Sequence, residues 1–332
     1  MIYSILLTLM LLSQQPDSVA VAFWNMENFF DPFVDSTRSY NEFTENGSQH
    51  WTPSRFYKKR NNLYKAILSF SGNQPLGIMG VCEVENEYVL NALFMWTPLK
   101  RFNYRWVHYE GPDHRGIDPA IVYSMDHFRL VYSEAIPYRN RDDPGMVSRD
   151  ILYAKFLDRS DDTLHCFVNH WPSKYRGELE TVAARNSAAA IVRRKVDSIT
   201  ATVHDAKVVI MGDFNDTPDA PCVSKVLGAK RLNTSGPSDL VNLFADANAL
   251  DFPGTLKYQE SWMVFDQIIV THSLLDGPGL HCSPSDARIV HDEVLLTDDP
   301  TYHGVKLNRT YVGPKYYGGF SDHLPVMLLL RY

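Results

Sequence analysis

The chain has 332 residues, 45% of them hydrophobic and 12% aromatic, which is enough for a buried core in one large α/β domain or two small ones. Its 39 acidic and 32 basic residues give a net charge of −7. That balance argues against a protein that coats nucleic acid through a broad basic surface. It leaves open an enzyme that holds phosphate locally, through a metal ion and a few Arg or Lys side chains.

The N-terminal region contains a short apolar run, residues 5–12, which is too short to span a bilayer as a helix. It resembles the hydrophobic region of a secretory signal, although no Lys or Arg precedes it and no Ala-x-Ala site follows it. We expect residues 1–18 to be a signal peptide or an N-terminal extension, and the chain to be exported to the periplasm or the medium. A cytoplasmic enzyme with a buried N-terminal segment is the alternative. No other segment has a transmembrane pattern, so we expect no stable membrane insertion.

The rest of the chain alternates irregularly between apolar runs of strand type and amphipathic segments of helix type. The predicted strands are residues 19–23, 77–82, 119–124, 164–168, 207–211, 265–271 and 321–330. The predicted helices are residues 54–70, with Ser54 as the N-cap, 87–96 and 178–200. Residues 31–53 are polar and predict a long surface loop. Irregular spacing favours mixed sheets with outer helices over a barrel, and site-like residues on both terminal strands favour a single domain, 19–332.

Four cysteines, Cys82, Cys166, Cys222 and Cys282, are widely separated along the chain. They form no Cys-x-x-Cys pair, which excludes a zinc ribbon or a thioredoxin-like motif. Buried free thiols are the favoured interpretation, because two of the four fall inside apolar runs. A disulfide in an exported chain stays open as the alternative.

Five polar clusters lie at the edges of the strand-like runs and together supply carboxylates, amides and imidazoles. They are Asn25-Met26-Glu27-Asn28, Cys82-Glu83-Val84-Glu85-Asn86, Asn169-His170-Trp171-Pro172, Gly212-Asp213-Phe214-Asn215-Asp216 and Ser321-Asp322-His323. This set suits a hard divalent cation and a phosphate ester. Mg²⁺ needs only one or two protein carboxylates, so Glu83 alone is sufficient, and Glu85 is a second candidate on the same side of an extended segment.

The cluster after residue 211 combines an acid with an amide. Gly212 allows the chain to turn as it leaves the strand, and Asp213 and Asn215, two apart in an extended segment, point the same way. They can hold a water and a phosphate oxygen together, although an Asx-rich turn explains the same sequence. His170 and His323 sit beside strand ends, where imidazole can donate to a phosphoryl oxygen or protonate a leaving oxygen. Zinc ranks lower because no close His spacing is present.

Three further side chains are candidates for phosphate binding. Asn25 can coordinate a cation or donate its amide to phosphate. Arg115 can donate to phosphate, and Lys174 follows a rigid Trp-Pro segment that can present a cation. A turn residue or a surface ion pair is the structural alternative for each.

The order of these clusters resembles the endonuclease/exonuclease/phosphatase superfamily, which includes DNase I, AP endonucleases, inositol polyphosphate 5-phosphatases and bacterial sphingomyelinases. Gly-Asp-x-Asn at 212–215 and Ser-Asp-His at 321–323, in this order, are specific for the superfamily but not for a substrate. The resemblance covers residues 19–332. It implies an α/β fold that is a four-layer α/β/β/α sandwich, with two mixed sheets face to face and helices outside.

The resemblance also implies which residues bind metal and phosphate. Glu83 would bind Mg²⁺ or Mn²⁺, with Asn25 and Asp322 as further metal-site residues. Asn25 and Asn215 would hold the phosphate and the water or the metal. Arg115 corresponds to the Arg that grips phosphate in the DNase I branch.

The catalytic residues implied by the resemblance are an acid, an amide and two imidazoles. Asp213 would orient and deprotonate the attacking water, with Asn215 beside it. His170 and His323 would donate to the phosphoryl oxygens in the transition state. Asp266 would polarise His323.

Departures from the family pattern bear on the substrate. Met211 precedes Gly212 and Gln267 follows Asp266, unlike the phosphoinositide branch, which lowers the rank of an inositol phosphatase. The active-site Tyr of many nuclease members has only Tyr109 and Tyr123 as candidates. We therefore expect a monomeric, metal-dependent phosphodiesterase of nuclease type that acts on a phosphate ester such as DNA or RNA. A lipid, inositol or sugar phosphate hydrolase, a zinc hydrolase and a non-catalytic binding module that kept the fold are the alternatives.

Overall fold

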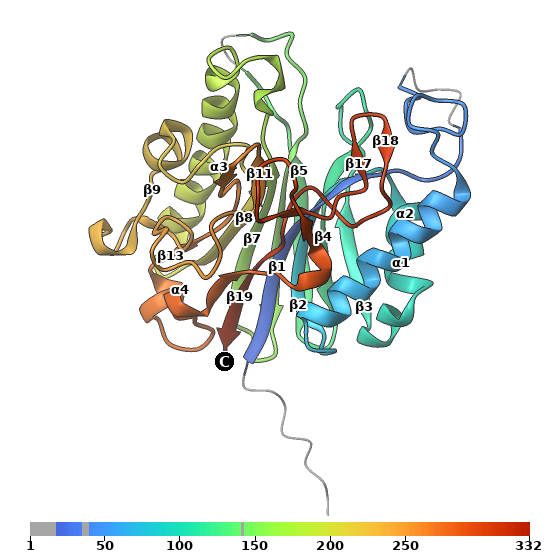
Figure 1. Cartoon of the computed structure of the whole chain (residues 1–332). Coiled ribbons are helices and arrows are strands. Elements are labelled where there is room, and N and C mark those ends of the chain that lie inside the picture. Colours follow the sequence, from blue (N-terminus) through green and yellow to red (C-terminus); the bar gives the residue numbers. More distant parts are fainter. Residues whose placement is uncertain (1–17, 35–39, 141–142) are drawn as a thin grey trace, which may run out of the picture.

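The computed structural model describes residues 18–34, 40–140 and 143–332. The expected signal peptide or extension, residues 1–18, lies outside the described residues except for Ser18. Within the described ranges, no helix combines the length and the apolarity that crossing a bilayer requires. Ser18 pairs with Arg331 near the C-terminus, so both ends of the described chain lie together at one end of the molecule (Figure 1).

Two mixed β-sheets stack face to face at the centre of the molecule (Figure 1). Among the described residues, the first sheet has six strands in the order β14 (Ala287–Ile289), β19 (Val326–Arg331), β1 (Ser18–Phe29), β2 (Leu76–Val84), β4 (Asp118–Ser124) and β3 (Tyr104–His108). The second has seven described strands in the order β5 (Phe128–Ile136), β6 (Ile151–Asp158), β7 (Thr163–His170), β8 (Lys207–Asp213), β13 (Asp266–Thr271), β10 (Leu240–Asn242) and β9 (Ala229–Lys230). The pairs β1–β2 and β7–β8 are parallel, so the expected mixed sheets are confirmed.

Helices cover the outer faces of both sheets. Helix α1 (Pro53–Phe70) and the short α2 (Glu87–Leu90) lie over the first sheet, and α3 (Val182–Thr202) lies over the second (Figure 1). A further short helix, α4 (Ser273–Asp276), follows β13. Three small hairpins complete the described elements: β11 (Leu256–Tyr258) with β12 (Ser261–Met263), β15 (Leu296–Asp298) with β16 (Val305–Leu307), and β17 (Tyr311–Val312) with β18 (Lys315–Tyr316).

Strand β8 shows how the layers are built from alternating side chains. Val209 and Met211 belong to the core between the sheets, whereas Val208 and Ile210 pack on the opposite face with the residues of α3, as the period of two of a strand requires. The sheets approach closely at Gly80, where a Cβ would lie 2.7 Å from Val168 Cγ2. The four-layer α/β/β/α sandwich expected from the resemblance is therefore the observed fold.

The first helix starts at a different residue from the predicted one, and the second changes its type along its length. Helix α1 begins at Pro53, and its N-cap is Thr52, whose hydroxyl accepts the Arg55 N–H at 3.4 Å, instead of Ser54. Proline at the first helical position favours this start because its missing N–H would be unpaired in any case. The second helix begins at Glu87 as predicted, but it continues after Leu90 as a wider π-type turn over Asn91–Met95.

Several strand bounds also differ from the prediction. The last strand begins at Val326 and not at residue 321, because Ser321 turns back to donate to the Asn25 carbonyl at 2.6 Å. Gly212 lies inside β8 and does not turn the chain; a Cβ there would lie 2.4 Å from the Asn169 carbonyl oxygen of β7. Strands β5 and β6 were not predicted. Strand β5 is an edge strand that exposes many of its side chains, so it lacks the apolar run that marks the other strands. All four cysteines are free and buried, as expected.

Candidate active site

The site forms where two parallel strand pairs end side by side. In the first sheet, Asn25 of β1 lies opposite Cys82 of β2, the residue before Glu83. In the second sheet, His170 of β7 lies opposite Asp213 of β8. Because β13 runs antiparallel to β8, its first residue, Asp266, is also opposite Asp213. Strand β19 runs antiparallel to β1, so the segment before it carries His323 to the same end of the molecule.

Asp213 is the centre of this cluster. Its Oδ2 accepts a hydrogen bond from the Asn25 amide at 3.1 Å, and it lies 3.6 Å from His170 Nε2 and 3.7 Å from His323 Nε2. The side chain is almost fully buried, and burial raises the pKa of Asp213 to about 7. A carboxylate whose pKa lies near neutrality is suited to accept a proton from a water molecule.

His323 is held by a buried acid and by its own backbone. Its Nδ1 lies 2.7 Å from Oδ2 of Asp266, which is fully buried. The His323 N–H donates to Ser321 Oγ at 3.1 Å, and its carbonyl accepts the Trp24 indole N–H at 2.9 Å. Burial alone would lower the pKa of His323, but the carboxylates of Asp266 and Asp213 hold it well above its usual range. The imidazole is therefore protonated at neutral pH and can donate from Nε2.

This pairing predicts a pH effect for Asp266→Asn. Without the carboxylate, the pKa of His323 should fall by about one to three units, so the alkaline limb of the kcat–pH profile should move to lower pH by a similar amount. Steady-state rates against a generic phosphodiester, measured across pH for both proteins, check this. An alkaline limb that does not move would show that His323 does not supply the proton.

His170 is the neutral counterpart of His323. Burial lowers its pKa well below the usual range, and the nearby Arg149, Arg115 and His323 add to that effect. Its Nε2 lies 3.7 Å from Glu83 Oε1 and 3.6 Å from Asp213, and for a neutral ring these are polar contacts and not ion pairs. Among the described residues, His170 Nδ1 has no hydrogen-bond partner.

Glu83 presents one oxygen to the site. Its Oε2 accepts the Asn28 N–H at 2.7 Å, whereas its Oε1 has long contacts, of 3.4 Å with the Asn25 amide and 3.7 Å with His170 Nε2. Its backbone has φ +60°, so the strand alternation that would put Glu85 on the same side is broken. Glu85 instead accepts the Asp31 N–H at 2.6 Å, so the geometric argument for Glu85 is wrong.

The donor set fits a divalent cation at Glu83. An incompletely satisfied carboxylate oxygen on a side chain that is 13% exposed is a hard ligand that faces the site, as Mg²⁺ prefers. A second combination, Asp213, Asp266 and His323, brings one ligand atom from each residue within 4.8 Å of the others. Asp266 already occupies Nδ1 of His323 at 2.7 Å, whereas Glu83 presents a carboxylate oxygen whose contact with the Asn25 amide is long, so we favour Glu83.

Three other predicted site residues, Asn215, Asp322 and Asn25, are held by hydrogen bonds or an ion pair with neighbouring groups. Asn215 has φ +50°, its N–H donates to Asp213 Oδ1 at 2.9 Å, and its amide donates to the Trp171 carbonyl at 2.9 Å. Asp213 therefore closes an Asx turn onto Asn215, and the extended geometry from which their common direction was predicted is not observed. Asp322 pairs with Arg309 at 2.7 Å, and Asn25 Oδ1 accepts the Glu27 N–H.

Each of the two predicted phosphate-binding cations is paired with an acidic side chain. Arg115 Nε lies 3.4 Å from Asp113 Oδ1, with 27% of its side chain exposed. Lys174 Nζ lies 2.8 Å from Asp216 and 2.9 Å from Glu178. Lys174 thus joins two loops through ion pairs, which is the structural alternative and not a free phosphate contact.

The two tyrosine candidates contact residues that are not among the predicted site residues. Tyr109 contacts Ser133, and Tyr123 packs against Phe156 with ring centroids 5.1 Å apart. Another tyrosine, Tyr40, lies in the same electrostatic environment as Arg115 and Glu83. Its pKa is raised to about 12, chiefly by burial, and the charges of Arg115 and Glu83 also shift it. It lies in a polar loop without periodicity, so no sequence pattern marks it.

A buried arginine and a buried ion pair beside the site were not predicted. Arg149 is buried and donates to Asp113 at 3.3 Å and to the Trp171 carbonyl at 3.2 Å, so it joins the Arg115 loop to the segment after His170. Glu27 and Lys59 form a buried pair behind Glu83. The helical pattern of α1 places Lys59 on its apolar face next to Leu63, and that mismatch is the signal that could have identified it.

The comparisons with known proteins agree with this geometry. Residues 20–332 match the Endonuclease/Exonuclease/phosphatase family. The chain belongs to this family. No curated protein sequence matches it.

Similar solved structures show the same fold at low identity. A mannosyl-6-phosphatase of Bacteroides thetaiotaomicron is 17% identical, with 95% of this chain and 100% of that chain covered and a TM-score of 0.59. D. rerio TDP2 complexed with a single-strand DNA product is 14% identical, with 96% and 100% covered and a TM-score of 0.57. The human Nocturnin catalytic domain is 14% identical, with 95% of each chain covered and a TM-score of 0.54. Members of this fold thus include a phosphatase and a DNA-bound protein.

Proposed function

We propose that this member of the family is a divalent-metal-dependent phosphodiesterase of nuclease type. The observation that carries the proposal is Asp213, placed between the Asn25 amide, a neutral His170 and a protonated His323. These acidic, basic and amide groups lie close together, and the Asn25 amide also contacts Glu83 at 3.4 Å. This arrangement suits attack of water on phosphorus.

Each side chain has a distinct part in the proposed reaction. Asp213 orients a water molecule and takes its proton as the water attacks phosphorus in line. His323, protonated and held by Asp266, donates from Nε2 to a phosphoryl oxygen, and His170 and Asn25 bind the other oxygens. Glu83 would hold a divalent cation, which would supply positive charge against the negative charge that develops on the phosphoryl group and leaving oxygen.

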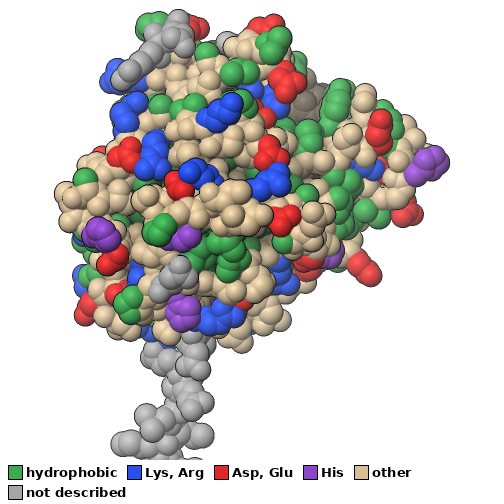
Figure 2. All heavy atoms as spheres, turned by 90° about the vertical axis from the view of Figure 1, so that its left-hand side faces the viewer, with side chains coloured by type: hydrophobic (Ala, Val, Ile, Leu, Met, Phe, Trp, Pro, Cys, Tyr) green, Lys and Arg blue, Asp and Glu red, His purple; other side chains and the backbone are tan. Residues whose placement is uncertain are grey.

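A surface beside the site supports a nucleic acid substrate. On α1 and the β17–β18 hairpin, the Arg55 guanidinium lies 4.3 Å from the centroid of the Tyr316 ring, and Lys315 Nζ lies 4.9 Å from that of Tyr317. Tyr317 is 54% exposed. Exposed aromatic rings beside cations can stack bases and bind phosphates of a single strand. On the face viewed in Figure 2, acidic and basic side chains are instead interspersed.

The proposal is tested with Glu83→Gln and a substrate panel. Wild-type protein should hydrolyse single-stranded DNA or RNA with Mg²⁺ or Mn²⁺ and lose activity with a chelator. Glu83→Gln should lose on the order of 10²-fold or more in kcat and need more Mg²⁺, with an unchanged melting temperature. Turnover of both proteins is measured against metal concentration.

The alternatives give different outcomes in the same panel. Turnover confined to a sugar, lipid or inositol phosphate would replace the nuclease assignment with that substrate class. Restoration by Zn²⁺ but not Mg²⁺ would indicate a zinc hydrolase. No turnover of any phosphate ester would indicate a binding module.

A further inference from the structure

A buried lysine and a buried glutamate lie directly behind the site. Lys59 of α1 and Glu27 of β1 have side chains only 1% and 2% exposed, and Lys59 Nζ lies 3.7 Å from Glu27 Oε2. The ammonium also donates to the Glu27 carbonyl at 2.5 Å, to Thr310 Oγ1 at 2.6 Å and to the Phe320 carbonyl at 3.2 Å. Within the part of the chain that the structure describes, the hydrogen bonds and the ion pair of this ammonium thus all go to two segments, the end of β1 and residues 310–320.

The first of these segments holds the proposed metal carboxylate. Glu27 and Asn28 have φ values of +47° and +51°, which non-glycine residues adopt rarely and only where the surroundings hold them. This conformation lets the Asn28 N–H donate to Glu83 Oε2 at 2.7 Å and the Glu27 N–H donate to Asn25 Oδ1 at 2.9 Å. The orientations of Glu83 and Asn25 therefore depend on this turn.

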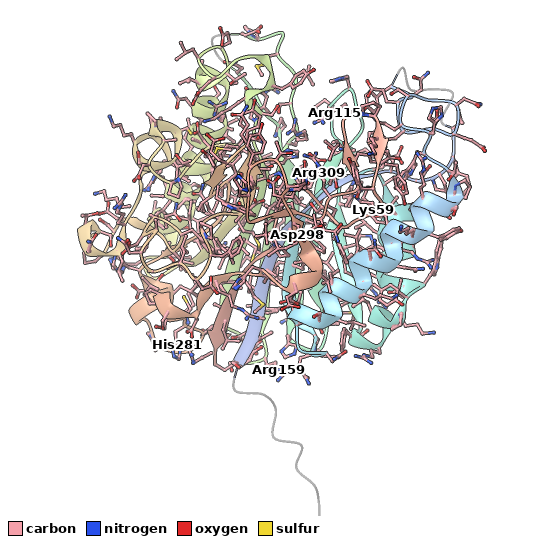
Figure 3. All side chains as sticks on the ribbon, in the orientation of Figure 1. Lys59, Arg115, Arg159, His281, Asp298 and Arg309 are labelled. Atoms are coloured by element: carbon pink, nitrogen blue, oxygen red, sulfur yellow. The ribbon has the colours of Figure 1, made fainter. Side chains whose placement is uncertain are left out.

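The second segment leads to the protonated histidine. The Glu27 carboxylate accepts the N–H groups of Thr310 and Tyr311 at 2.7 and 3.2 Å. Arg309 lies 3.4 Å from Glu27 and 2.7 Å from Asp322, the residue before His323. Lys59 and Arg309 lie near each other in Figure 3, and both pair with Glu27.

The cost of this arrangement argues against a purely structural explanation. Burying two charges costs more than their attraction returns unless the geometry is good, and apolar residues of similar size often hold a fold equally well. Among the described residues, every hydrogen bond of the ammonium goes to the end of β1, which contacts Glu83, or to residues 310–320, which lead to His323. A group placed in this way fixes those segments relative to each other.

We propose that Lys59 is a positioning residue that, through Glu27, holds the metal-binding face of Glu83 and the His323 segment in register. This rests on the proposed metal site at Glu83 but not on the identity of the substrate. Outer partners that orient metal ligands typically contribute about 10–100-fold to metal affinity. Lys59→Met keeps an unbranched side chain, one atom shorter, but removes the three donors.

The experiment compares Lys59→Met, Glu27→Gln and the double variant. Lys59→Met leaves the buried Glu27 charge without its lysine partner and with the partly exposed Arg309 at 3.4 Å, so it should lower the melting temperature as well as function. The double variant removes both charges and should recover much of the melting temperature. Its Mn²⁺ affinity, measured by calorimetry and by the electron paramagnetic resonance signal of free Mn²⁺, should still be about 10–100-fold weaker than that of wild type. Lys65→Met, an exposed position on α1, is the control and should change neither quantity.

The outcomes separate positioning from stability. If the double variant recovers both melting temperature and Mn²⁺ affinity, Lys59 only balances the charge of Glu27 and the proposal is overturned. A wild-type protein that binds no Mn²⁺ would overturn it as well. A wild-type protein that binds Mn²⁺ but cleaves no phosphodiester would contradict the proposed function alone, because the affinity comparison needs no turnover.

Discussion

Replacing Asp213 by Asn should reduce kcat by at least about a hundredfold, within the 10²–10⁴-fold range typical of a positioned base. Asn keeps the shape of the side chain and can accept one of the two hydrogen bonds that the carboxylate accepts from Asn25 and Asn215, but it cannot accept the proton of the attacking water. The melting temperature should not fall, because the carboxylate is buried and burial raises its pKa, so a neutral side chain is easier to bury. Turnover and thermal unfolding of the same preparations check both parts.

His323→Ala should reduce kcat by a similar factor but should also lower the melting temperature. Its removal leaves Asp266, which is 0% exposed, without the imidazole partner at 2.7 Å, and an unpaired buried carboxylate is costly. Because Asp213 and His323 act on one transition state, the double variant should lose much less than the product of the two single losses. Full multiplicativity would show that the two residues act in separate steps. Near-normal turnover of Asp213→Asn would show that Asp213 does not accept the proton of the attacking water.

The sequence predicted the fold and most members of the site because buried strands that end in polar residues have a clear pattern. Asp213, His170 and Asp266 follow or begin such strands, and strand pairing brings them together without further information. The resemblance supplied the layer order, which the alternation of Val208 and Val209 between two cores bears out.

Local backbone conformation could not be predicted in the same way. The positive φ values of Glu83 and Asn215 break the alternation on which their side-chain directions were predicted, although the Asx turn at Asp213 was the alternative that the sequence left open for Asn215. They depend on partners far along the chain, such as the Trp171 carbonyl that accepts the Asn215 amide.

Buried polar and charged residues in loops and helices could not be predicted from the sequence either. Arg149 and Tyr40 lie in segments without periodicity, and their relation to the site depends on contacts with Asp113 and Arg115 that only the folded chain brings about. Lys59 and Arg185 lie on predicted helices, where the residue type alone suggests an exposed position. Their burial follows from the segments that pack over those helices.

The largest stability loss is expected for Arg185→Met. Arg185 of α3 is fully buried and donates to Asp216 at 2.9 Å and to Thr181 Oγ1 at 2.7 Å. Breaking a buried ion pair typically costs about 3–5 kcal/mol, and we expect the lower end because Lys174 still pairs with Asp216 at 2.8 Å. Denaturant unfolding of the purified variant measures this free energy.

A surface pair on the same helix gives the matched control for that measurement. Arg193 pairs with Asp197, whose side chain is 54% exposed, and such pairs contribute at most about 0.5 kcal/mol, so Arg193→Met should unfold almost like wild type. Asp216 follows Asn215 and lies next to the turn that holds Asp213, so Arg185→Met should also reduce kcat under conditions in which it is still folded. Equal unfolding free energies for the two variants would show that the buried pair contributes no more than a surface pair. Unchanged kcat in folded Arg185→Met would show that Asp213 is held without it.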